Sequence, residues 1–347
     1  MTKHEHSSYI VTGGCGFIGA NLVAELQKRR PGTHVIVIDS MRTGSFECLV
    51  SACARNNDVF RGEVLGQSIR DVFWPEILDQ HRPAAVFHLG AITDTTVDDE
   101  AEMIEENAGE TWPEMMAACI GREVPLVYAS SAATYGTPPE AASKLPFPES
   151  SAGKPNNVYG FSKWLMEMAH ARLDRERNAA GASRAWVVGL RYFNVFGPGE
   201  THKGKMASMA LQLTQQILAG KRPRLFEHGE QARDQVSVHD IVGITLAAAG
   251  LGDRRDPEPG VYNAGSGHVT SFEEIARAVR LGLGITESEL PTEFIPMPAH
   301  IRTFYQDFTC ADMSCAQAGL GFKPSHDPAE SVGSYARWLA DQQAEEA

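Results

Sequence analysis

The sequence predicts an α/β fold: a Rossmann-type doubly wound parallel sheet, followed by a smaller, mixed C-terminal lobe. Short runs of β-branched and other apolar residues alternate with longer amphipathic stretches through the first half of the chain. That alternation is typical of a parallel sheet covered by helices on both faces. A glycine-rich turn joins the first strand to the first helix. After about residue 196 the alternation loosens, which favours a second lobe.

The individual elements follow from their periodicity, in chain order. Strands of the sheet are predicted at residues 9–11, 35–38, 85–88, 126–129 and 185–190, with helices at 17–29 and 102–120. In the C-terminal part we expect helices at 207–219, 239–249, 271–283 and 328–339, and a short strand at 292–295.

Composition excludes several classes of function. The 347 residues carry a net charge of −13, which argues against nucleic acid or an anionic membrane as the main partner. No run of about 18 apolar residues appears, and the first residues have no apolar signal-peptide core. The six cysteines are scattered without CxxC spacing, so we expect thiols and no metal site. We therefore expect a cytoplasmic protein.

The glycine-rich turn predicts a dinucleotide site. Gly13, Gly16 and Gly19 lie between a predicted strand and a predicted helix, and such glycines allow close approach of a pyrophosphate to the helix N-terminus. Asp39 follows the second strand and could bind the adenosine ribose, which suggests NAD. Arg42 could instead pair with a 2′-phosphate, which suggests NADP, or could be an ordinary loop residue. We expect the dinucleotide domain to span 1–196, with a return near 234–265, and a substrate lobe at 197–347.

Tyr159 and Lys163 are the candidate catalytic pair. They stand four residues apart at the start of a predicted helix, so their side chains share one face. A free tyrosine titrates near about 10, and a neighbouring ammonium and an oxidised nicotinamide would lower that pKa. Tyr159 could then accept a proton from a substrate hydroxyl as hydride leaves.

Small hydroxyl residues follow the strand at 126–129. Ser131 and Thr134 stand at its carboxyl end, where doubly wound sheets bind ligands. They could hydrogen-bond the reacting oxygen and the substrate. Alone, this stretch would be a turn with capping serines.

Together, TGGCGFIG, SSAATYG and YGFSK resemble the extended short-chain dehydrogenase/reductase superfamily, whose members modify nucleotide sugars. More narrowly, the segments GETHKGKMAS, PRLFE and FYQDFT resemble the ADP-glyceromanno-heptose 6-epimerases, and the similarity runs from about residue 9 to residue 339. That resemblance implies an NADP-dependent isomerase that inverts C6 of an ADP-heptose, a precursor of lipopolysaccharide. It also implies a homo-oligomer.

The resemblance assigns further residues. It makes Lys203, in the HKG segment, a second acid/base beside Tyr159, with Ser131 and Lys163 completing the catalytic set. The cofactor contacts that it implies are Gly13, Gly16, Phe17, Ile18, Gly19, Asp39, Ser40, Arg42, Leu89, Gly90, Ala91, Asn107, Lys163 and Val195. The substrate contacts that it implies are Ser131, Thr134, Asn194, Lys205, Gln212, Phe226, Glu227, Arg233 and Tyr305.

Two alternatives stay open at this point. Lys205, Gln212 and Gly229 stand where heptose epimerases have serine, histidine and serine, so another nucleotide-sugar epimerase or dehydratase is a rival. A dehydratase would carry an acid pair after Thr134, where Tyr135 and Gly136 stand instead. A non-catalytic NAD(P)-binding sensor or scaffold is a rival of another class, although such proteins commonly lose the tyrosine or the lysine.

Overall fold

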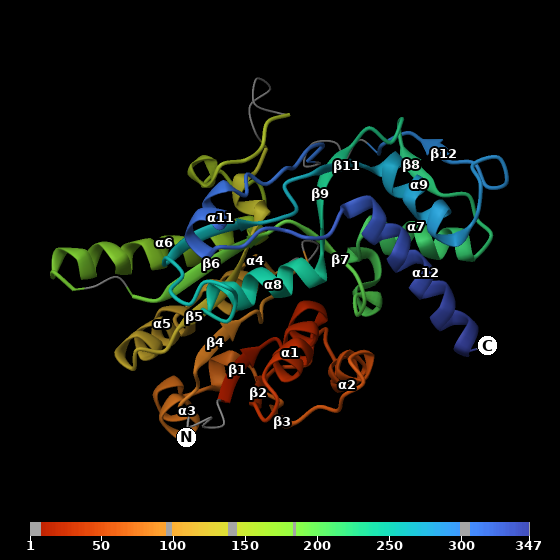
Figure 1. The fold of residues 1–347 in the computed structure, drawn as a ribbon. Coiled ribbons are helices and arrows are strands. Elements are labelled where there is room, and N and C mark those ends of the chain that lie inside the picture. The colour runs from red at the N-terminus through yellow and green to blue at the C-terminus, as the bar shows by residue number, and fades with distance from the viewer. Residues whose placement is uncertain (1–7, 95–98, 138–143, 183–184, 299–305, 347) are drawn as a thin grey trace.

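The computed structural model describes residues 8–94, 99–137, 144–182, 185–298 and 306–346. A parallel sheet lies at the centre with helices on both faces, and a smaller lobe built from later segments lies beside it (Figure 1). The predicted fold class is confirmed. Among the described residues, no helix is both long and apolar enough to cross a membrane. The boundary that we placed at residue 196 stays an expectation.

The central sheet has seven parallel strands in the order β10-β6-β5-β4-β1-β2-β3. The order reverses direction between β1 and β4, and ligands of such sheets bind beside the carboxyl ends of the strands at that point. The strands are β1 (Ser8–Thr12), β2 (His34–Ile38), β3 (Gly62–Leu65), β4 (Ala85–His88), β5 (Leu126–Ser131), β6 (Val187–Tyr192) and β10 (Gly260–Ala264).

Side chains from alternate positions of the strands fill two cores. Val11, Val37 and Phe87 pack toward one layer of helices, whereas Ile10 and Ile36 pack toward the other. The first layer comprises α1 (Phe17–Arg29), α2 (Phe46–Arg55) and α8 (Val238–Ala248). The second comprises α3 (Trp74–His81), α5 (Thr111–Gly121) and α6 (Val158–Ala179), with α4 (Glu100–Ala108) packed on α6.

The smaller lobe has its own core, which includes Phe196, Leu211, Ile275 and Val332. Most of its strands have three residues and β9 has six, and the helices α7, α9 and α12 supply most of the apolar side chains of this core. The elements are β7 (Asn194–Phe196), α7 (Met209–Leu218), β8 (Arg224–Phe226), β9 (Ala232–Ser237), β11 (Val269–Ser271), α9 (Phe272–Leu283), β12 (Glu293–Ile295) and α12 (Pro328–Glu346). Helix α11 (Ser314–Leu320) instead packs against β10 and α8 of the larger domain.

The predicted single helix at 102–120 is wrong, because it is two helices, α4 and α5, separated at Gly109 and Glu110. Gly109 ends α4, and its backbone lies so close to Glu105 that a Cβ there would collide with the Glu105 carbonyl oxygen. The apolar periodicity runs through the break, which is why the sequence reads as one helix. Strand β3 and helices α2 and α3 were not predicted, because few of their residues are buried.

Candidate active site

The glycine-rich turn forms a cradle with an open helix N-terminus above it. Gly13 has a φ of 68°, which favours glycine, and a Cβ there would lie 2.7 Å from the backbone nitrogen of Gly90. Helix α1 then begins at Phe17 after Gly16, which has no side chain to cap the free N–H groups. These N–H groups and the missing side chains suit the pyrophosphate of a dinucleotide.

Asp39 holds the turn from the end of β2. One of its carboxylate oxygens accepts a hydrogen bond from the Cys15 backbone N–H (2.9 Å), and the other accepts from the Met41 N–H (2.8 Å). Each oxygen keeps capacity for a ribose hydroxyl. Arg42 is exposed and makes a two-pronged ion pair with Glu102 of α4, at 2.7 and 3.2 Å. A 2′-phosphate would have to compete with Glu102 for this arginine.

The end of β4 closes the cradle. Gly90 donates its backbone N–H to the Thr12 hydroxyl (3.0 Å), which holds Leu89, Gly90 and Ala91 beside the turn. Asn107, one of the predicted cofactor residues, is buried, and its amide bonds both Ile92 backbone groups and the Ser162 hydroxyl. Asn107 therefore joins this loop to α6. Phe17 is buried, Ile18 is partly buried and Ser40 is exposed.

The structure brings Ser131, Tyr159 and Lys163 together, and we name this group the tyrosine wall. Ser131 ends β5, and its side chain hydrogen-bonds that of Tyr159 from the first turn of α6. Asn157 caps α6 by accepting the Gly160 N–H (2.8 Å), which fixes where the helix begins. Lys163 is buried one turn on and donates to the Ala129 carbonyl (2.9 Å).

Burial dominates the titration of both groups in the tyrosine wall. It lowers the pKa of Lys163 to about 8, because a desolvated ammonium is disfavoured. Burial also raises the pKa of Tyr159, and the hydrogen bond with Ser131 opposes that rise. The chain alone therefore does not lower the pKa of Tyr159, contrary to our expectation for a neighbouring lysine. When bound, a nicotinamide dinucleotide would supply reversible redox chemistry and a positive ring.

A buried polar network, absent from our sequence prediction, stands behind the tyrosine wall. Glu167, one turn after Lys163, accepts from the Ser130 hydroxyl (2.5 Å) and from Arg191 of β6 (2.7 and 3.0 Å). Arg191 also donates to the Tyr135 hydroxyl, which donates to Asn263 of β10. The network thus ties α6, β5, β6 and β10 to one another. A buried acid on the sheet-facing side of α6 is the sequence signal that could have revealed it.

Lys203 lies in another part of the site, in residues 200–206, which we name the lysine segment. Its Nζ lies 5.5 Å above the centre of the Phe17 ring, at the first turn of α1. Burial lowers the pKa of Lys203, and the charge of Glu200 opposes this. Glu200 is buried and accepts hydrogen bonds from the Gly197 N–H and from the Ser208 N–H and hydroxyl. Glu200 therefore bonds the backbone on both sides of the lysine segment.

The other predicted substrate residues are more dispersed. Thr134 is fully buried, and its hydroxyl donates to the Ser131 carbonyl (2.9 Å). Asn194 is exposed at the start of β7, whereas Val195 after it is partly buried. Gln212 donates to the Ala207 carbonyl (2.8 Å) beside exposed Lys205. Phe226 and Glu227 follow along β8 and its turn, Arg233 is buried in β9, and Tyr305 lies outside the described residues.

The histidines at this site have structural partners. His88 Nδ1 lies 2.8 Å from the Thr12 hydroxyl, and the ring stacks on Trp112. Burial, with the nearby charge of Lys163, lowers the pKa of His88 to about 3, so the ring is neutral. Within the described part of the chain, no group of three or more histidine, cysteine or acidic side chains is arranged to hold a metal ion.

These features define a class: a Rossmann-fold protein with a dinucleotide cradle and a serine–tyrosine–lysine group at the carboxyl ends of its strands, as in short-chain dehydrogenases. Comparison of the sequence with known families identifies one family within this class. Residues 9–265 match the NAD dependent epimerase/dehydratase family, and the chain belongs to that family.

Several solved structures share the whole fold. A Helicobacter pylori ADP-L-glycero-D-manno-heptose-6-epimerase is 30% identical, with 97% of each chain covered and a TM-score of 0.80. A UDP-N-acetylglucosamine 4-epimerase from Methanobrevibacter ruminantium is 25% identical, with 97% of this chain and 99% of that chain covered and a TM-score of 0.79. A UDP-glucose-4-epimerase from Stenotrophomonas maltophila with bound NAD is 24% identical, with 99% and 100% covered and a TM-score of 0.80, and it shows the fold alone.

Proposed function

We propose that the protein is an isomerase that converts ADP-D-glycero-D-manno-heptose to ADP-L-glycero-D-manno-heptose at C6, with a tightly bound NADP. The observation that carries an epimerase is the tyrosine wall, in which Ser131 hydrogen-bonds Tyr159 and Lys163 stands one turn behind. Support for the heptose comes from the HKG segment and from the 30% identity to the heptose epimerase.

In the proposed reaction, Tyr159 accepts the proton of the C6 hydroxyl as that carbon is oxidised to a carbonyl; the hydride leaves to a bound oxidised nicotinamide and returns in the later reduction. Ser131 hydrogen-bonds the same oxygen and orients it. The carbonyl must then be reduced on its other face, so a second proton donor is needed for the reoriented substrate. Lys203 fills that role, because its lowered pKa brings its proton loss nearer to neutral pH.

Arg42 supports NADP over NAD in this proposal, because a guanidinium suits the 2′-phosphate. Glu102 now holds Arg42, and Asp39 suits an unmodified ribose, so NAD is the alternative. Mass spectrometry of the dinucleotide released by heating the purified protein distinguishes the two. We further propose that the enzyme is a cytoplasmic homo-oligomer.

The decisive experiment follows C6 configuration by proton NMR after mixing the purified protein with ADP-D-glycero-D-manno-heptose. We expect a mixture of both C6 epimers, with no net change in cofactor redox state. UDP-glucose and UDP-N-acetylglucosamine are run in parallel. Turnover of one of these instead would assign the protein to another nucleotide-sugar epimerase. No turnover of any of them, with dinucleotide still bound, would favour a sensor.

A further inference from the structure

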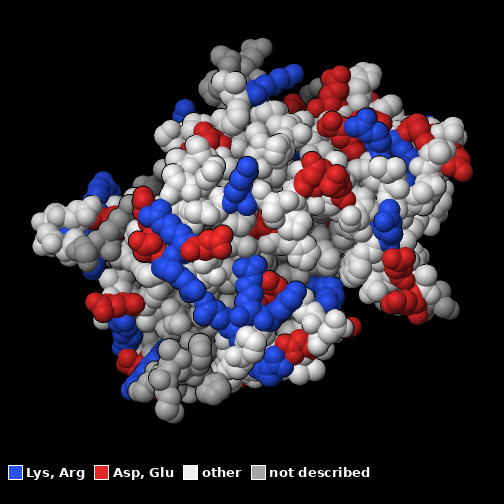
Figure 2. Space-filling view, viewed as in Figure 1, with Lys and Arg blue, Asp and Glu red and all other residues white. Residues whose placement is uncertain are grey.

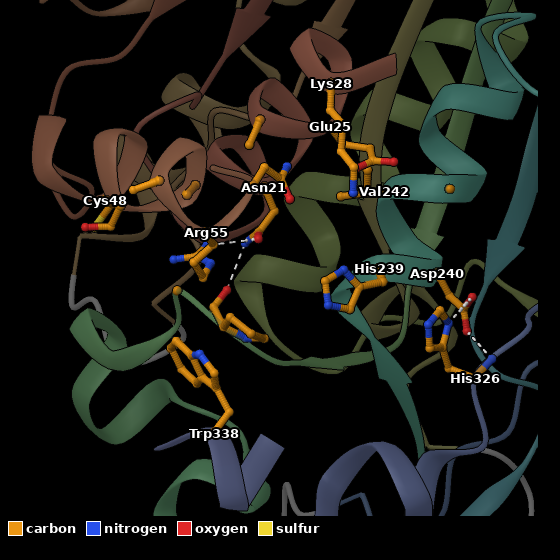
Figure 3. Close-up of a pocket in the computed structure, with 18 of the residues that line it drawn as sticks. Asn21, Glu25, Lys28, Cys48, Arg55, His239, Asp240, Val242, His326 and Trp338 are labelled. Carbon is orange, nitrogen blue, oxygen red and sulfur yellow. Dashed lines mark hydrogen bonds and ion pairs between the residues drawn. The ribbon is translucent and has the colours of Figure 1, made fainter. Parts of the chain in front are cut away.

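A groove of about 1810 Å³ lies between the sheet's first helical layer and the smaller lobe. Its walls come from α1, α2 and α8 of the first layer and from α7 and the later turns of α12 in the smaller lobe (Figure 3). Ser131, Tyr159 and Lys163 are not among its lining residues. The groove exceeds the 300–1,000 Å³ or so of common small-molecule sites, so it could hold a ligand of nucleotide size.

Arg55 is the central cation of this groove. It is partly buried at the end of α2, and it donates to the Asn21 side-chain oxygen at 3.0 Å. No carboxylate in the described ranges lies within ion-pair distance of it. Burial lowers the pKa of Arg55. A desolvated guanidinium without an acid is costly, and an anion would relieve that cost.

His239 faces Arg55 across the groove (Figure 3). Its ring centre lies 5.8 Å from that of His326, which bonds Asp240 at 2.8 Å. Partial burial, followed by the charges of His326 and Arg55, lowers the pKa of His239, and Glu25 and Asp240 oppose this. Basic groups therefore converge on one space, although the whole chain is acidic.

Over the whole lining the charged side chains balance in number, with four Asp or Glu and four Lys or Arg, so the positive charge is local to Arg55. Glu25 is taken by Arg29 at 2.6 Å, and Asp240 is taken by His326. Glu47 and Asp253 line the groove, as do Lys28 and Lys323. On the molecular face over α1 and α8, Lys and Arg side chains lie with Asp and Glu side chains among them (Figure 2).

The floor of the groove continues into the lysine segment. Asn21, which accepts from Arg55, donates in turn to the Pro198 carbonyl at 2.9 Å. Farther along, the Cys48 sulfur lies 3.5 Å from His202 Nδ1, next to Lys203. Two hydrogen bonds therefore link Arg55 to the backbone that leads to Lys203.

We propose that this groove is a second binding site, separate from the tyrosine wall, for a phosphate-bearing anion. Arg55 at the end of α2 and His239 of α8 hold the phosphate between them, and Asn21 keeps the guanidinium in place. Trp338, stacked on Tyr335 at 5.9 Å, lines the same space and offers an aromatic surface to any organic part of the ligand. The proposal is independent of which nucleotide sugar the enzyme converts.

The test uses inorganic pyrophosphate as the probe and the His239 ring as the reporter, in cofactor-loaded full-length protein. His239 is assigned by comparison with His239→Gln, and its Cε1 proton is followed by NMR during the titration. We expect a saturable shift and a higher His239 pKa, because a bound anion favours the charged ring. In Arg55→Gln, apparent affinity should fall by about tenfold or more, the loss of one charge-assisted contact. Arg172→Gln, at an exposed arginine of α6 outside the groove, is the control and should retain binding.

Two results would overturn the proposal. One is a His239 resonance that does not respond to pyrophosphate up to about 10 mM, a concentration range that covers weak binding. A groove covered by a second copy of the chain would give this result. The other is a shift of equal affinity in Arg55→Gln and in the unmodified protein. Arg55→Lys guards against misfolding, because it keeps the charge and should retain part of the affinity.

Discussion

Lys163 and Lys203 both lie at the candidate active site, yet the protein holds them in different ways. Lys163 sits inside the tyrosine wall, bonded to β5 and backed by the network of Glu167 and Arg191. Lys203 stands on a short 3-10 turn, where Gly204 is left-handed and Glu200 is the main buried anchor. One part of the chemistry is thus built into the sheet core, whereas the other is carried by a surface segment. Substitutions around Lys163 should therefore change stability, whereas substitution of Lys203 should change activity.

The largest effect is expected from Tyr159→Phe. This change removes the group that exchanges a proton with the substrate, so turnover should fall by about 10³-fold or more. Dinucleotide content, measured by mass spectrometry of the purified variant, should stay the same. Substantial activity in this variant would remove Tyr159 from the mechanism.

Breaking the buried pair behind the tyrosine wall should cost about 3–5 kcal/mol of unfolding free energy, because the remaining charge is left buried without a partner. Glu167→Gln and Arg191→Met are compared by urea unfolding at neutral pH, and the double variant should lose less than the two single losses combined. Arg172→Gln, in the exposed pair with Glu176, is the control and should leave the midpoint unchanged. A loss in Arg191→Met no larger than in this control would contradict the prediction.

Lys163 should make stability depend on pH. Its pKa is about 8 in the folded chain, below the ordinary value of 10.5, so the unfolded chain binds more protons between these values. Unfolding free energy should therefore rise by up to ~3 kcal/mol as pH increases from about 8 to about 10.5, relative to Lys163→Met. Urea unfolding of the dinucleotide-free proteins measures this difference. Parallel pH profiles would exclude a desolvated ammonium.

Lys203→Met should have the smallest effect of these variants. It should lower activity and leave stability unchanged. We expect kcat/KM to fall by about 10- to 100-fold, since one proton-transfer group is lost while the tyrosine remains. The unfolding midpoint should not change, because the lysine segment contributes little to the core. Lys221→Met, an exposed lysine after α7, is the matched control. An unfolding midpoint that falls with activity would show that Lys203 is structural.

Local sequence patterns predicted the glycine turn and the pair Tyr159 and Lys163 of the tyrosine wall, because both depend on residues close together in the chain. The four-residue spacing of Tyr159 and Lys163 fixes their shared face once the helix forms. The network around Arg191 could not be predicted in this way, since its members come from separate strands and helices. The ion pair between Arg42 and Glu102 joins residues 60 positions apart, and it depends on where α4 packs.

The two hydrogen bonds that Asp39 accepts from backbone N–H groups have a practical consequence for engineering. The carboxylate is oriented before any ligand arrives, so cofactor binding need not immobilise it, and little affinity is spent on ordering. The same bonds make Asp39 a poor starting point for changing cofactor preference, because replacing it would also release Met41 from its left-handed conformation. Arg42 and Glu102, whose exposed side chains pair with each other, are the positions at which a redesign should begin.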